Sequence, residues 1–210
     1  ISITHYDGAT SQSANRNVTG TGVAPALIAI SDGPTYDYGN RATGGNTDKI
    51  FTLINNGGLG ATAMSGGGLA APFSFKGGSY PGTGGDCGAA LSPNTSCTII
   101  VTYSPVADGV LSDAIDIAFN NGVSGQTSSR SIQGNGVPPA VLTISDGLTY
   151  DYGSVATTGS SDKVFTLSNS GGFSASTISA NALAAPFSFK GGTFPGTGGT
   201  CGATLAVSGS

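Results

Sequence analysis

The chain has 210 residues, of which 36 are glycine and 9% are charged, and its formal net charge at pH 7 is −4. Seven lysines and arginines are too few for a basic patch, so we expect no nucleic-acid partner. No apolar run approaches the roughly 18 residues of a membrane span, so we expect no membrane span in this segment. The 38% of hydrophobic residues argue against a disordered chain and favour a β-rich one with many turns.

The N-terminal segment reads as two short strands. Residues 1–3 alternate apolar and polar side chains, Asp7 and Gly8 mark a turn, and residues 12–19 are expected to return as a second strand. Residues 20–26 follow as a short, stiff junction because proline fixes φ.

Further along, apolar residues alternate with polar ones in several short runs. Phe51 and Leu53 share one face, which we expect to point inward. The Asn55–Gly58 turn is expected to need positive φ. No run shows a helical period, and the spacing predicts a β-sandwich. We expect strands at 27–31, 36–38, 49–55, 73–75, 87–91, 97–103 and 115–119, one centred on Ile132, and one core made of Phe51, Leu53, Phe73, Phe75, Ile99, Val101, Ile115 and Ile117.

An internal repeat with an offset of 114 residues organises the chain. Ala26–Ser96 aligns without a gap on Ala140–Ser210, with 43 of 71 positions identical, and residues 1–26 align on residues 115–140. Repetition at a fixed period indicates tandem units of one fold. We therefore expect three parts: the C-terminal hairpin of a preceding repeat at 1–24, a complete repeat at 25–138, and a truncated next repeat at 139–210.

A set of motifs recurs in a fixed order along the chain: Tyr38-Gly39, Phe51–Gly58, Cys87, Leu91–Cys97, Val101–Pro105 and Gly134–Gly136. Their order resembles the choice-of-anchor D group of immunoglobulin-like repeats of the Hydin-related (ASH-like) type. This resemblance implies tandem immunoglobulin-like β-sandwiches in arrays on large exported proteins of bacterial surfaces. It covers essentially the whole chain, although residues 73–85 form a longer insertion than the family pattern has.

Three cysteines occur, and Cys201 is the counterpart of Cys87. A Cys87–Cys97 disulfide would link two strands of a hairpin and would imply an oxidising compartment. The alternative is a pair of free buried thiols. No second cysteine pair or histidine accompanies them, so we expect no metal site.

The remaining polar residues suggest no catalytic set. His5 is the only histidine and glutamate is absent. Asp37 and Asp151 are interpreted as solvated turn residues, with a weak calcium site between repeats as the alternative. The glycine-rich loops after Phe75 and Phe189 are either packed loops or contact surfaces, in which Tyr80 or Phe194 would be the aromatic anchor.

We therefore expect a non-enzyme with no catalytic, cofactor-binding or metal-binding residues. The primary interpretation is a structural repeat module of a long extracellular fibre, stalk or adhesin shaft on a bacterial cell surface, polymerising or continuing head to tail. Its partners would be neighbouring copies or repeats of itself. The alternative is a ligand-binding adhesin module that recognises a surface glycan or host protein through the glycine-rich aromatic loops.

Overall fold

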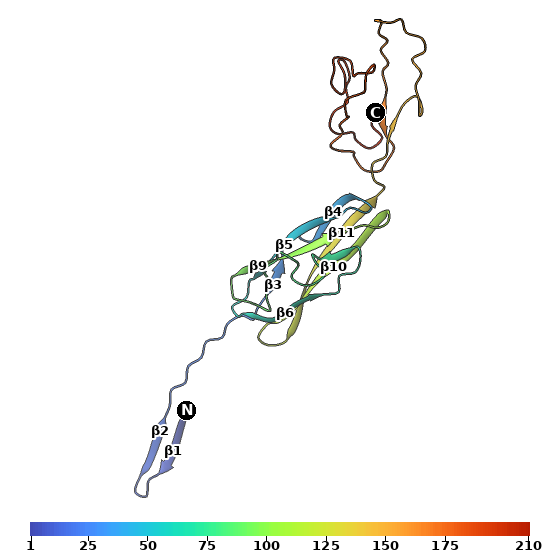
Figure 1. Ribbon diagram of the computed structural model, residues 1–210. Coiled ribbons are helices and arrows are strands. Elements are labelled where there is room, and N and C mark those ends of the chain that lie inside the picture. The colour runs from blue at the N-terminus through green and yellow to red at the C-terminus, as the bar shows by residue number, and fades with distance from the viewer.

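The computed structural model describes residues 1–210, and its regular structure consists entirely of strands. Figure 1 shows the N-terminal hairpin, a central sandwich and a C-terminal unit following one another, with the two chain ends at opposite ends of the molecule. The strands are β1 (Ser2–Tyr6), β2 (Ser11–Asn15), β3 (Ile28–Ile30), β4 (Thr35–Ala42), β5 (Thr47–Asn55), β6 (Ala61–Gly67), β7 (Phe73–Phe75), β8 (Ala90–Leu91), β9 (Ser96–Tyr103), β10 (Gly109–Asn120), β11 (Gly125–Val137), β12 (Leu142–Ile144) and β13 (Leu167–Asn169).

Two sheets form the central sandwich. One has the order β3-β5-β9-β7 and the other has the order β4-β11-β10-β6-β8. The first strand of the fold is divided between them, because β3 pairs antiparallel with β5 whereas β4 pairs parallel with β11. This arrangement is that of an immunoglobulin-like sandwich.

One apolar cluster of 20 buried residues fills the space between the sheets, and it contains all eight residues of the predicted core. Phe51 and Leu53 are fully buried, while Thr52 and Ile54 between and beyond them face solvent, which confirms the strand phase. Alternation produces this result because successive side chains of a strand point to opposite faces.

Several elements differ from the predictions. Strand β6 was not predicted, β2 ends at Asn15, and the segment after Cys87 forms strand only at Ala90–Leu91. The positive φ expected in the Asn55–Gly58 turn was also wrong, since none of its four residues has a positive φ. A Cβ at Gly57 would collide with the Pro25 carbonyl oxygen, so glycine is needed there for the close approach of the junction.

The N-terminal hairpin stands apart from the sandwich, and every residue of β1 and β2 is exposed. Its register nevertheless matches that of β10 and β11. Tyr6 pairs with Ser11 in the hairpin, and Asn120 pairs with Gly125 in the sandwich, each displaced by 114 positions.

The C-terminal unit has little regular structure. Its strands are β12 and β13, which pair from Leu142↔Asn169 to Ile144↔Leu167, with an isolated bridge between Ala175 and Leu205. The β12–β13 pairing reproduces that of β3 and β5 in the sandwich, where Ile28 pairs with Asn55.

Candidate functional site

A disulfide joins Cys87 to Cys97, as the sequence predicted, while Cys201 is free. Both bonded cysteines belong to the apolar core. Cys97 lies on β9, and Cys87 ends the glycine-rich loop, so the bond ties that loop to the centre of the four-stranded sheet.

Tyr80, the candidate anchor of the glycine-rich loop, packs inward on the sandwich. Its ring meets the Phe75 ring edge to face at a centroid distance of 5.7 Å, and its hydroxyl donates a hydrogen bond to the Gly88 carbonyl at 3.3 Å. Burial raises the pKa of the Tyr80 phenol. In the C-terminal unit Phe194 meets Phe189 in the same way at 5.6 Å. These rings therefore anchor their loops, and Tyr80 is partly buried against the core cluster.

A hollow of about 330 Å³ adjoins Tyr80 and is lined in part by Gly66, Gly67 and Gly68. The corresponding residues of the C-terminal unit are Ala180, Asn181 and Ala182. A Cβ at Gly66 would collide with the Phe75 and Tyr80 rings, whereas nothing lies within 4 Å of a Cβ at Gly67 or Gly68. This place is therefore one where the two copies differ in surface shape.

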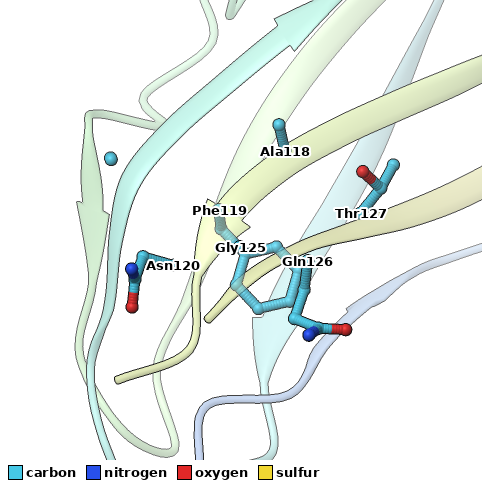
Figure 2. A pocket seen from close by; sticks show the side chains of 7 residues that line it. Ala118, Phe119, Asn120, Gly125, Gln126 and Thr127 are labelled. Atoms are coloured by element: carbon cyan, nitrogen blue, oxygen red, sulfur yellow. The ribbon is translucent and has the colours of Figure 1, made fainter. Parts of the chain in front are cut away.

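A second, wider hollow of about 610 Å³ lies at the tip of the β10–β11 hairpin. Figure 2 shows the Phe119 ring between the side chains of Asn120 and Gln126. The Phe119 side chain is buried, so the open lining consists of small and amide side chains. It contains no charged or nucleophilic group, and sequence reasoning had not singled out this place.

The carboxylates are engaged in local turns and ion pairs. Asp37 accepts hydrogen bonds from the Gln133 amide and the Gly39 backbone N–H, which hold the pKa of its carboxyl below the usual range. Asp151 accepts the equivalent bond from Gly153. No group of three or more histidine, cysteine or acidic side chains is placed to hold a metal ion. His5 lies exposed on β1, away from any acidic partner in the sandwich.

Asn55 is the polar residue that sequence reasoning missed. It is fully buried at the end of β5. Its Oδ1 accepts from the Leu27 and Gly57 backbone N–H groups, each at 3.0 Å, and its Nδ2 donates to the Leu59 and Leu91 carbonyls at 2.8 and 3.1 Å. One side chain thus ties the junction, the β5–β6 turn and β8 together.

The same network recurs in the C-terminal unit. Asn169 is almost fully buried, and its Oδ1 accepts from Val141 and Gly171 at 3.1 Å each. The signal in the sequence was the identity of this asparagine in both copies, separated by one residue from a pair of glycines.

No family model matches the chain, and no curated protein matches it. The structure contains no helix with the length and apolarity needed to cross a membrane.

Solved structures with similar folds share little sequence with it. The chain is similar to the VesB protease of Vibrio cholerae (17% identity, TM-score 0.43, covering 51% of this chain and 31% of that one). It is also similar to the ASH/PapD-like domain 7 of human CEP192 (14% identity, TM-score 0.41, covering 64% of this chain and 99% of that domain). A Porphyromonas gingivalis protein of unknown function matches at 13% identity and TM-score 0.39, covering 64% and 61%. The chain spans about a third of the length of the VesB structure.

Proposed function

We propose that this protein is a structural repeat module of a long extracellular fibre, stalk or adhesin shaft that extends head to tail. The observation that carries the proposal is the shared register of the β1–β2 and β10–β11 hairpins, because it assigns the N-terminal segment the role of the last two strands of a repeat. The partners are then further repeats or copies of the same kind.

Support for a shaft comes from the junctions. At the first, the Gly58 N–H donates to the Ala24 carbonyl at 3.1 Å, and at the second, the Gly172 N–H donates to the Pro138 carbonyl at 3.1 Å. A Cβ at Gly171 would collide with Pro139 just as one at Gly57 would collide with Pro25. Two junctions with the same contacts give successive repeats the same entry geometry, which suits an extended rod.

We place the module outside the cell, on a bacterial surface, and among the choice-of-anchor D repeats that its motifs resemble. The Cys87–Cys97 disulfide supports an oxidising compartment.

Immunogold electron microscopy of the producing cells tests this proposal. Antibodies raised against residues 1–210 should label filaments or stalks outside the cell, and a strain without the gene should lose the label. Label confined to the cell interior would contradict the proposal.

The second candidate is a ligand-binding adhesin module, which the hollow beside Tyr80 favours because its glycine lining is replaced in the other copy. A glycan array probed with the full chain tests it. Binding that is lost in Gly67→Asn, which introduces the residue of the other copy, would support this function over the shaft.

A further inference from the structure

Apolar side chains of the N-terminal hairpin are exposed where their counterparts are core residues. Ile1, Ile3 and Val18 are 71%, 62% and 69% exposed. Their counterparts Ile115, Ile117 and Ile132 are fully buried in the sandwich. The hairpin therefore has the inward face of β10–β11 but nothing packed against it.

The C-terminal unit has the complementary defect. Phe165 and Phe187 are 39% and 55% exposed, whereas their counterparts Phe51 and Phe73 are buried in the core cluster that contains Ile115 and Ile117. The unit thus has the face that β10–β11 cover in the complete repeat, and that face is open.

A contact between an arginine and a glycine in the central sandwich shows more specifically how the faces of the hairpin and of the C-terminal unit fit together. In the sandwich the Arg130 guanidinium donates to the Ile30 carbonyl and, at 3.0 Å, to the Pro34 carbonyl. It lies so close to Gly33 that a Cβ there would collide with it. Arg130 and Gly33 are therefore a matched pair, one on β11 and one at the corner between β3 and β4.

Both members of this pair are kept in the unpartnered segments. Arg16 is the counterpart of Arg130, and Gly147 is the counterpart of Gly33. Gly147 has a φ of 77°, unlike Gly33, and nothing lies within 4 Å of a Cβ built on it, so no arginine contacts this glycine in the C-terminal unit. The neighbouring Asp146 carboxylate pairs with Lys163 at 2.7 Å, as its counterpart Asp32 pairs with Lys49 at 2.8 Å. The bond from Lys49 is the main cause that lowers the pKa of Asp32, and the Arg130 charge adds a smaller contribution.

We propose that the β1–β2 hairpin of one copy docks on the C-terminal unit, residues 138–210, of a second copy, in the position that β10–β11 hold in the complete repeat. This inference rests on the proposed head-to-tail role and names its joint. A second copy is required because the hairpin and the C-terminal unit of one chain lie at opposite ends of the sandwich (Figure 1).

The docked register follows from the complete repeat. There Ile117 pairs with Gly66 and Ala118 pairs with Ser65. The counterparts of Ala118 and Ser65, 114 residues away in each case, are Thr4 and Ser179. In the joint, Thr4 of one copy would therefore pair with Ser179 of the second copy. Residues 17–23 would run parallel to residues 149–156, as β11 runs parallel to β4. Such a joint is heterologous, so it forms open chains of copies instead of closed dimers.

His5 stands at the position of buried Phe119, and the polar imidazole there weakens the apolar contact of the joint.

Cysteine crosslinking of the full chain tests the register. In a Cys201→Ser background, Thr4→Cys combined with Ser179→Cys should give a ladder of covalent dimers, trimers and longer chains on mild oxidation. The control combines Thr4→Cys with Ser161→Cys, whose counterpart Thr47 lies on the other sheet. Equal ladders from both pairs, or no ladder from either, would overturn the proposal.

Sedimentation velocity tests the side chains. Self-association of the full chain should weaken by about tenfold or more in Arg16→Ala, since a charge-assisted contact is lost. It should be abolished in Ile3→Asp, be unchanged in the outward-facing Thr4→Asp, and strengthen in His5→Phe. These four residues are exposed in the free chain, so the substitutions leave its fold intact.

The outcomes separate this joint from the proposed function. A chain that stays monomeric at all concentrations overturns the docking while surface filaments could still be labelled by the antibody. Label inside the cell with an intact crosslinking ladder would instead refute the extracellular role and keep the joint.

Discussion

Replacing Asn55 with alanine tests whether one buried amide holds the repeat together. The substitution removes the acceptor of two backbone N–H groups, those of Leu27 and Gly57, and the donor to two carbonyls. The bond from the Gly57 N–H is buried, whereas the bond from the Leu27 N–H is only partly buried. Loss of the Leu27 bond should therefore lower the free energy of unfolding by less than loss of the Gly57 bond.

The magnitude follows from these two donors. A buried N–H left without a partner costs about 1–3 kcal/mol, so we expect Asn55→Ala to lower the free energy of unfolding by about 2–4 kcal/mol. The free energy of unfolding of a small domain is about 5–15 kcal/mol in total, so this change is large enough to measure easily.

Urea unfolding of the full chain, followed by far-ultraviolet circular dichroism, measures this change. The matched control is Asn56→Ala, because Asn56 is exposed, its counterpart is Ser170, and its side chain makes no hydrogen bond. We expect the control to stay within about 0.5 kcal/mol of the wild type. Equal stability of the two variants would refute the role assigned to Asn55.

Three further predictions concern single features. Phe51→Ala should lower the free energy of unfolding by about 3–5 kcal/mol, because it empties a fully buried site, and a loss below about 1 kcal/mol in a urea titration would contradict the core assignment. Replacing Cys87 and Cys97 with serine should lower the free energy of unfolding by about 2.5–3 kcal/mol, because the disulfide closes an 11-residue loop. Cys201→Ser should leave the free energy of unfolding unchanged. Calorimetry of all variants measures both effects. In the β1–β2 turn, backbone hydrogen bonds, with that from Thr10 the strongest, lower the pKa of the Asp7 carboxyl to about 2. Because this pKa is lower in the folded hairpin than in the unfolded chain, the ionised carboxylate stabilises the hairpin at pH values above the unfolded pKa. The turn should therefore be fully ordered above about pH 4 and be lost as the pH falls through about 2. An NMR titration midpoint of Asp7 near pH 4 would contradict the turn.

Strict alternation made much of the sandwich predictable. Phe51 and Leu53 lie on one face of their strand, and Ile54 lies on the other. The copy distinguishes the two faces, because Ile54 becomes Ser168 whereas Phe165 and Leu167 stay apolar. Strand β6 escaped prediction because its sequence, Ala61–Gly67, has small residues and no regular alternation, and it is held by pairing with β10 and β8.

Long-range contacts account for what the sequence did not reveal. Asn55 looks like a turn residue, and its role depends on Leu91, which is 36 positions away. Gly57 looked like a residue for positive φ, but its requirement comes from the backbone of Pro25, which approaches from the preceding junction. The glycine-rich loop left open whether Tyr80 packs or forms a contact surface, and its edge-to-face contact with the strand residue Phe75 shows that it packs.

The parallel pairing of β4 with β11 has a mechanical consequence. The chain enters the sandwich at one end and leaves it at the other (Figure 1), and these two strands are its entry and exit paths. A pull on both ends therefore slides β4 and β11 past one another. The pairs from Thr35↔Ser131 to Ala42↔Val137 then bear the load together instead of opening one at a time. This pairing gives the repeat resistance to tension along its own axis.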